Sequence, residues 1–240
     1  MPRGAGACSA QFASSHGLGL ESEYVDGVWL VELASQFSWY VTCWTEHTGS
    51  LTEERCSTHT QSPESGGPTC SSWFDRPVVR TCFCMFYRKT GAGTGVGEEN
   101  RQAMKALVDG GTVPGLIGYE NGVPVAWVSL GPREDYAKLR RSPVMKPVDD
   151  QPVWSIVCFY VMPTGRGRGL AVKLLRAAED YARSCGARLV EAYPVDREQP
   201  GHPDAMFFGA KSMYDRAGFR EVARRRPTRP VVRKALLPKG

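Results

Sequence analysis

The stretch CFYVMPTGRGRGLA, residues 158–171, decides how the rest of the chain is interpreted. It continues an apolar run that begins at Trp154. Because this run is rich in β-branched and aromatic residues, it predicts a buried strand that ends at Pro163. Beyond the glycines, apolar residues recur at spacings of three and four over residues 170–185, which predicts a helix stopped by Gly186. The unit is therefore a strand, a glycine loop and a helix.

The glycine loop has the properties of an anion-binding site. The first amides of a helix lack partners within the helix, and the helix dipole makes that end partly positive. Glycines let an anion approach the backbone closely, and Arg166 and Arg168 add positive charge. We therefore expect the loop to bind a diphosphate. The alternative is a simple turn with solvated arginines.

Two common phosphate loops are excluded by their spacing. A P-loop requires Lys followed by Ser or Thr after its last glycine, and Leu170 and Ala171 stand there instead. A dinucleotide fingerprint anchored on Gly165 and Gly167 requires a glycine at position 170. The loop must belong to another class.

The pattern V-x-P-x-x-R-G-x-G-L-A, which begins at Val161, resembles the acyl-CoA pyrophosphate loop of the GNAT superfamily of N-acetyltransferases. The core of that loop is R/Q-x-x-G-x-G/A, and Arg166, Gly169 and Ala171 fill its three places. A second motif, YDRAGF at residues 214–219, is similar to the family's Y-x-x-x-G-F signature. Two motifs in the family's order, with one expected strand between them, are more specific than either alone.

This resemblance implies a mixed α/β fold of the acyl-CoA N-acyltransferase type, with a splayed central sheet flanked by helices. It covers residues 82–237, so we expect an acetyltransferase domain over residues 82–240. Residues 1–20 are small and polar, which predicts a disordered tail. Residues 21–81 form a divergent N-terminal segment of uncertain structure, which the resemblance does not reach.

The resemblance also implies the reaction and its residues. Acetyl-CoA is the expected co-substrate, and an acyltransferase of this family moves its acetyl group to a primary amine by direct attack through a tetrahedral intermediate. The amide of Phe159 corresponds to the group that binds the oxyanion, and the backbone of Val161 to the group that holds the pantetheine arm. The diphosphate is expected at the amides of Arg166, Gly167, Arg168, Gly169, Leu170 and Ala171. Tyr214 corresponds to the general acid, and the alternative is a tyrosine packed beneath the sheet.

The acceptor amine must lose a proton, so a general base or a chain of waters is expected. Glu191 is our candidate base, because strand alternation places it on one face with Leu189 and Tyr193, next to the cofactor strand. The alternative is a surface glutamate. His202 is either a site residue or an exposed loop histidine. Asp149 and Asp150, in a long connection over residues 131–150 that we expect near the site, either recognise a cationic substrate or are solvated.

The remaining segments are assigned from periodicity and turn residues. Cys82 and Cys84 alternate in a short apolar run, which predicts a strand with both thiols on one side, in the core or in a wall of the site. Asn121-Gly122 is a tight-turn pair. The other expected elements are a helix over 98–108, hairpin strands over 115–119 and 123–130, a strand over 188–193 that is parallel to the cofactor strand, a helix over 205–217, and an antiparallel pair over 219–224 and 230–236.

Composition limits the class of protein and its partners. The 240 residues carry 30 basic and 25 acidic side chains, and a net charge of +5 does not by itself indicate a nucleic-acid partner. The basic cluster over residues 220–233 is interpreted as a solvated strand edge. Since there is no apolar run of about 18 residues and no secretory leader pattern, we expect no membrane span. Eight cysteines without a C-x-x-C pair favour a reducing cytoplasm.

Other patterns in the sequence are typical of different functions. Cys43, His47, Cys56 and His59 are zinc-type ligands, but their central spacing is short, so we expect no metal. The chain could be a non-catalytic acyl-CoA-binding or regulatory module, or it could bind nucleic acid through the basic loop over residues 165–169. We expect a small-molecule or protein amine as substrate, no nucleic acid and no membrane, and a monomer or homodimer.

Overall fold

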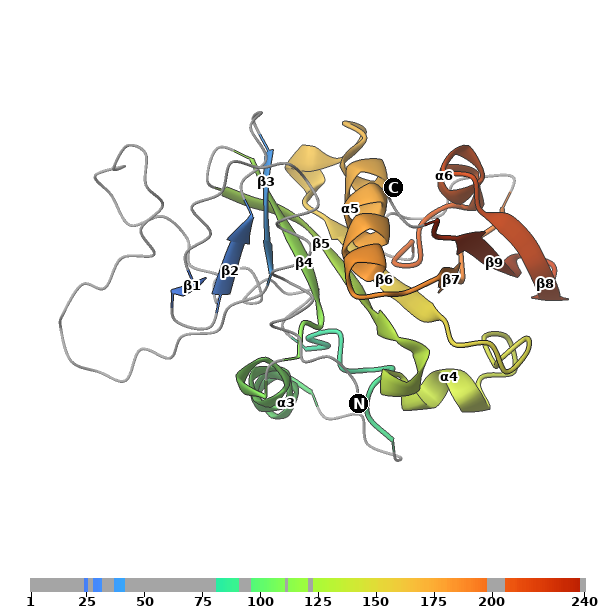
Figure 1. Cartoon of the computed structure of the whole chain (residues 1–240), viewed down its shortest axis with the longest axis horizontal. Coiled ribbons are helices and arrows are strands. Elements are labelled where there is room, and N and C mark those ends of the chain that lie inside the picture. Colours follow the sequence, from blue (N-terminus) through green and yellow to red (C-terminus); the bar gives the residue numbers. More distant parts are fainter. Residues whose placement is uncertain are drawn as a thin grey trace, which may run out of the picture.

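The strands that the structure describes form one continuous mixed sheet (Figure 1). The computed structural model describes residues 24–25, 28–31 and 37–41 (backbone only), 81–90, 96–110, 112–120, 123–197 and 206–237. Over these residues the order is β1-β2-β3-β4-β5-β6-β7-β9-β8, and every neighbouring pair is antiparallel except β6 with β7. The strands are β1 (Tyr24–Val25), β2 (Val28–Val31), β3 (Phe37–Val41), β4 (Gly115–Glu120), β5 (Val123–Pro132), β6 (Trp154–Val161), β7 (Leu189–Ala192), β8 (Arg220–Arg226) and β9 (Arg229–Ala235).

Helices cover both faces of this sheet. They are α3 (Glu98–Asp109), α4 (Ala137–Arg141), α5 (Leu170–Ser184) and α6 (Lys211–Arg216), with short 3-10 turns η1 (Arg133–Asp135) and η2 (Pro163–Gly165). Because successive residues of a strand point to opposite faces, Val128 packs against α5 while its neighbour Trp127 packs against Met104 of α3. The apolar side of α5, including Leu174 and Ala178, is wholly buried there. No helix in the described part of the chain is long and apolar enough to cross a membrane.

The sheet splays open between β6 and β7. These two strands pair in parallel over only three rungs, from Trp154 opposite Val190 to Ile156 opposite Ala192. On its other side β6 stays paired with β5 as far as Val161. The second half of β6 therefore faces an opening, which confirms the predicted mixed, splayed sheet.

A β-bulge lies where the opening begins. In the ladder with β5, Ser129 is opposite Cys158 and Leu130 is opposite Ile156, so Val157 has no partner. The extra residue puts Val157 and Cys158 on the face opposite α5, and Phe159 returns to the α5 face. Bulges re-aim side chains and backbone groups, and they are common beside active sites. Nothing in the residue pattern indicated this one.

Most predicted elements are present, including the cofactor strand, the helix after the glycine loop, the hairpin strands and the C-terminal antiparallel pair. Two predictions are wrong. The run at residues 82–87 is a series of turns rather than a strand, and Phe83 and Cys84 have φ of 46° and 52°. The helix over 205–217 shrinks to α6, because residues 209–211 make backbone bonds with Val195 instead of helical ones.

Several predicted features lie outside the described residues. They are the possible zinc ligands Cys43, His47, Cys56 and His59, the turn pair Asn121-Gly122, and His202. The connection over residues 131–150 is described, and three of its residues, Tyr136, Leu139 and Met145, pack in the same cluster as Phe208. It starts at Pro132, which pairs with Trp154, the first residue of β6. The connection therefore contacts the residues around Phe208, although none of its residues lines the pocket against β6.

Candidate active site

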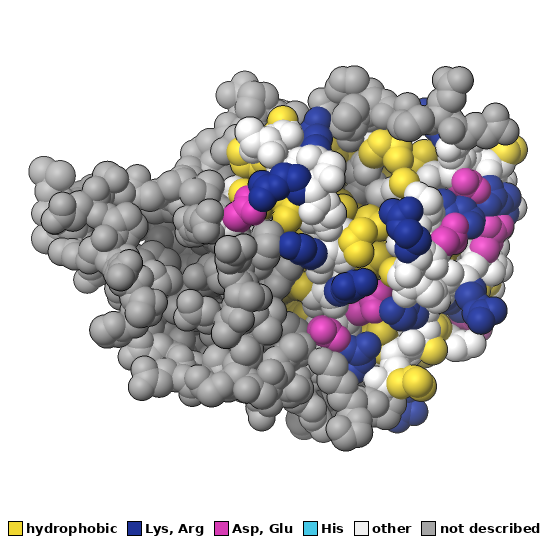
Figure 2. All heavy atoms as spheres, turned by 90° about the horizontal axis from the view of Figure 1, so that it is seen from above, with side chains coloured by type: hydrophobic (Ala, Val, Ile, Leu, Met, Phe, Trp, Pro, Cys, Tyr) yellow, Lys and Arg dark blue, Asp and Glu magenta, His cyan; other side chains and the backbone are white. Residues whose placement is uncertain are grey.

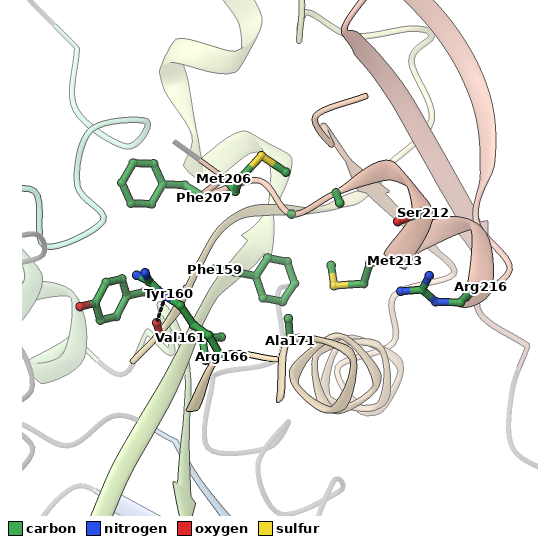
Figure 3. Close-up of a pocket in the computed structure, with 12 residues that line it drawn as sticks. Phe159, Tyr160, Val161, Arg166, Ala171, Met206, Phe207, Ser212, Met213 and Arg216 are labelled. Carbon is green, nitrogen blue, oxygen red and sulfur yellow. Dashed lines mark hydrogen bonds between the residues drawn. The ribbon is translucent and has the colours of Figure 1, made fainter. Parts of the chain in front are cut away.

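A pocket of about 280 Å³ lies against the unpaired half of β6 (Figure 3). Its walls come from β6, from the glycine loop and first turn of α5, and from α6 with the segment that leads into it. The lining residues are Phe159, Tyr160, Val161, Arg166, Ala171, Met206, Phe207, Gly209, Ala210, Ser212, Met213 and Arg216. Four of the residues predicted from the sequence, Phe159, Val161, Arg166 and Ala171, thus meet in one place.

The glycine loop opens toward solvent at the start of α5. Gly167 and Gly169 have φ of 75° and 76°, a left-handed conformation that favours glycine, and Gly169 is the residue that caps α5. A Cβ atom added at either position would have no neighbour within 4 Å. The amides of residues 167–171 have no acceptor among the described residues. The loop therefore provides open space and unpaired N–H groups at the positive end of a 15-residue helix, as an anion requires.

The arginine side chains around this loop differ in their hydrogen-bond and ion-pair partners. Arg166 donates from Nε to the carbonyl of Val161 at 3.2 Å, as the dashed line in Figure 3 shows. Arg168 makes a two-pronged ion pair with Glu120, which raises the pKa of Arg168. Arg216 lines the pocket, is exposed, and has no ion-pair partner in the described part of the chain. Figure 2, which looks down on this end of the molecule, shows Lys and Arg side chains in greater number than Asp and Glu on the described surface.

The amide of Phe159 is directed into the opening and is hydrogen-bonded to a carbonyl oxygen there. It donates to the carbonyl of Phe207 at 2.6 Å. Phe207 belongs to the segment that lines the other side of the pocket. The strand thus presents a backbone donor to a carbonyl oxygen at the position predicted for the oxyanion.

Tyr214 lies beside this donor but not in the pocket lining. Its ring packs edge-on against Phe159, with 6.3 Å between the centroids, and is fully buried. Its hydroxyl donates to the carbonyl of Phe208 at 3.0 Å. Burial, and then the nearby Cys158, raise the pKa of Tyr214, so the phenol keeps its proton at neutral pH.

Glu191 is placed differently from what its predicted role requires. Its carboxylate is fully buried and accepts from Arg233 Nε at 2.7 Å, from Arg133 Nη1 at 3.5 Å and from the Tyr193 hydroxyl at 2.7 Å. It does not line the pocket. These contacts suit a group that holds β7 to β9, and they argue against a free general base.

The two acidic residues predicted to recognise a cation do not meet the pocket either. Asp149 pairs with Arg233 Nη1 at 2.6 Å, and this contact lowers the pKa of Asp149. Asp150 is exposed.

Eight of the twelve lining residues were not predicted from the sequence. Met206, Phe207, Gly209, Ala210, Ser212, Met213 and Arg216 were placed in or near a regular helix, with no role in the site. Gly209 was the available signal. Its φ of 75° breaks the predicted helix and turns the backbone of residues 206–210 toward β6.

Residues 83–219 match the model of the acetyltransferase (GNAT) family. No curated protein matches the chain. Among solved structures, yncA from Salmonella typhimurium, determined with its cofactor acetyl-CoA, is 20% identical, with a TM-score of 0.39 over 66% of this chain and 82% of that one. A GNAT-family protein from Desulfovibrio desulfuricans is 18% identical, with a TM-score of 0.38 over 58% and 83% of the two chains.

Proposed function

The chain belongs to the acetyltransferase (GNAT) family, and on that premise we propose that it transfers the acetyl group of acetyl-CoA to a primary amine. One observation carries the proposal. The open glycine loop at the start of α5 and the amide of Phe159, on the unpaired half of β6, border the same pocket. A diphosphate site and an oxyanion donor are the two parts that acyl transfer from coenzyme A requires.

The residues present suit the co-substrate. The unpaired amides of residues 167–171 would bind the diphosphate, with the exposed Arg216 as a further positive group. The backbone of Val161 would pair with the pantetheine arm, since no strand occupies that side of β6 among the described residues. The arm then leads along β6 to the amide of Phe159.

Acetyl transfer needs a donor for the oxygen that becomes negative. In our proposal, the thioester oxygen takes the place of the Phe207 carbonyl on the Phe159 amide. A donor placed in this way typically contributes about 3–4 kcal/mol to the stabilisation of the transition state. The amine attacks the carbonyl carbon, the tetrahedral intermediate collapses, and the sulfur leaves.

The leaving thiolate takes a proton from Tyr214 in this scheme, and water returns a proton to the tyrosine. Burial keeps the Tyr214 phenol protonated, and the tyrosine ring is in contact with the residue that binds the oxyanion. The amine proton is lost to water, because both oxygens of Glu191 are engaged by buried partners. The acceptor is an amine on a small molecule or a protein.

A second candidate function follows from one specific contact. The Phe159 amide is occupied by the Phe207 carbonyl, and the hydroxyl of Tyr214 is bonded to the next carbonyl, that of Phe208. A chain that kept this arrangement when acyl-CoA was bound would be a binding or regulatory module without turnover.

The first test is a thermal shift with acetyl-CoA, free CoA and ATP. A ligand at about 100 times its dissociation constant stabilises a protein by about 2.7 kcal/mol, or about 5–10 °C for a chain of this size. We expect both CoA species to raise the melting temperature and ATP to leave it unchanged. Release of the CoA thiol with a panel of amines then separates the two functions. Binding without thiol release on any amine supports the module, and no binding contradicts both functions.

A further inference from the structure

A group of aromatic and cationic side chains lies on the face of the sheet opposite α5. The ring of Phe208 packs edge-on against Tyr87, with 5.7 Å between centroids, and against Tyr193 at 6.5 Å. The guanidinium of Arg229, the first residue of β9, lies over the same ring, 4.2 Å from its centroid. The Arg229 guanidinium and the Phe208 ring thus form a cation–π contact.

No acidic side chain among the described residues balances the charge on Arg229. Arg229 has no carboxylate partner in the described part of the chain. Asp196 lies beside the turn, because its amide donates to the carbonyl of Thr228 at 3.0 Å, but its carboxylate pairs with Arg224 at 2.7 Å. Burial lowers the pKa of Arg229, and the nearby positive charge of Arg197 lowers it further. A half-buried cation normally has an acidic partner, and Arg229 has none among the described residues.

Tyr87 adds a second donor to the same space. Its hydroxyl has no hydrogen-bond partner among the described residues, and its ring is half-buried against Phe208. Burial is the main cause that raises the pKa of Tyr87 to about 12, so the phenol is neutral at physiological pH. A guanidinium and a phenol offer donors, and no acidic acceptor accompanies them among the described residues. That combination suits an anionic ligand group.

This donor group lies directly across β6 from the pocket of the glycine loop. Phe208 follows Phe207, whose carbonyl is 2.6 Å from the Phe159 amide. Cys158, the residue before Phe159, packs in the same cluster as Tyr87 and Phe208. Phe208 therefore links the donors Arg229 and Tyr87 to the segment that borders the Phe159 amide.

We propose that the acceptor amine carries a carboxylate, which binds to the Arg229 guanidinium and the Tyr87 hydroxyl beside the Phe208 ring. This inference rests on the proposed acetyltransferase function and narrows its substrate class to amino acids and related amino carboxylates. It assigns Arg229 and Tyr87 to acceptor recognition, without a part in the transfer of protons.

The test uses matched pairs of amines with the full chain and acetyl-CoA. Each pair differs only in the anionic group: β-alanine with β-alaninamide, and 4-aminobutyrate with 4-aminobutanamide. An aminoalkyl phosphonate serves as a third arm to distinguish carboxylate from phosphate recognition. The readout is kcat and KM from thiol release. We expect kcat/KM for the carboxylate to exceed that for its amide by about 10- to 100-fold, because charge-assisted hydrogen bonds are lost with the amide.

Substitutions test whether the preference for a carboxylate acceptor depends on Arg229 and Tyr87. Arg229→Gln should raise KM for the carboxylate by about 10- to 100-fold, with little change in kcat or in KM for acetyl-CoA. Tyr87→Phe should raise the same KM by a smaller factor, and it keeps the ring contact with Phe208 if Arg229→Gln folds poorly. Arg220→Gln is the control, because it removes one positive charge from an exposed position on β8.

The outcomes separate this inference from the function on which it rests. Equal kcat/KM for carboxylate and amide, or a preference that survives Arg229→Gln, overturns the carboxylate site and leaves the acetyltransferase in place. A preference for the phosphonate overturns the assignment to amino carboxylates. Failure to bind acetyl-CoA overturns both.

Discussion

Substitution of Gly169 with Glu tests the diphosphate site most directly. Gly169 caps α5 in the left-handed conformation, and a side chain there would extend into open space at the mouth of the loop. The carboxylate would stand where the diphosphate is proposed to bind. We expect a protein that folds and has lost most of its affinity for acetyl-CoA.

The size of each effect follows from the geometry. A non-glycine residue in the left-handed region costs about 1–2 kcal/mol. A negative charge at the start of a helix returns about 0.3–1 kcal/mol, so the free energy of unfolding should fall by less than about 2 kcal/mol. A carboxylate at ~6 Å from a phosphate charge, with an effective dielectric constant of about 20–40, repels it by about 1.4–2.8 kcal/mol. Affinity for acetyl-CoA should therefore fall about 10- to 100-fold.

Calorimetric titration with acetyl-CoA measures this loss, and two variants serve as controls. Gly169→Ala carries the backbone cost without the charge, so its affinity should stay within about threefold of the wild type. Gly186→Glu places the same charge in the same left-handed conformation, with the same open space, just beyond the other end of α5. The Gly186→Glu variant should be less stable than the wild type and should bind acetyl-CoA with wild-type affinity. An unchanged dissociation constant for Gly169→Glu, or an equal loss in Gly186→Glu, would refute the diphosphate site.

Three further predictions concern the groups behind the pocket. Tyr214→Phe removes the hydrogen bond to the carbonyl of Phe208, so we expect a loss of about 1 kcal/mol in urea unfolding and a fall in kcat of about 10²–10⁴-fold; normal turnover would show that this tyrosine is not the acid. Glu191→Gln leaves Arg233 buried with one partner fewer, so the free energy of unfolding should drop by about 3–5 kcal/mol; a small drop together with a large loss of kcat would restore the role of base. The contact with Arg233 lowers the pKa of Asp149, so its contribution to stability is present above the ordinary aspartate value near 4 and is lost as pH falls through the lowered value; Asp149→Asn should flatten the acid limb of the stability curve measured by circular dichroism.

The sequence predicted those parts of the fold that depend on neighbouring residues. The strand that begins at Trp154, the glycine loop after it and the periodic helix follow local rules for propensity, backbone freedom and amphipathic spacing. The left-handed conformation of Gly167 and Gly169 is a finding of the structure. The parallel return to β7 follows from chain connectivity, because a short link after a helix leaves little choice.

Features that depend on distant contacts could not be predicted in this way. The bulge at Val157 arises from the register between β5 and β6 and leaves no mark in residue type. The turns at Phe83 and Cys84 place two apolar residues in a conformation their type disfavours, and burial against Trp127 compensates for it. The indole of Trp127 donates to the Cys84 sulfur at 3.1 Å across 43 positions of sequence.

The same distinction between local and distant contacts applies to the residues of the candidate site. Arg166 and Ala171 could be identified from the sequence because a diphosphate loop made of backbone amides has a short linear motif. Glu191 was assigned to the wrong environment, since a polar residue on a strand has the same pattern whether it faces a substrate or a buried arginine. Its partner Arg233 is 42 residues away, and only the fold brings the two together.

The contact between Phe159 and Phe207 links the fold to the proposed chemistry. The bulge and the splay leave the Phe159 amide without a strand partner, and a buried amide without an acceptor costs about 1–3 kcal/mol. The Phe207 carbonyl removes that cost in the protein alone. A thioester oxygen that replaces it exchanges one neutral hydrogen bond for another, so the amide contributes little to the binding of acetyl-CoA. As the oxygen becomes an oxyanion, the bond becomes charge-assisted and about twice as strong. The Phe159 amide therefore stabilises the transition state more than the bound thioester, so its hydrogen bond raises kcat rather than the affinity for acetyl-CoA.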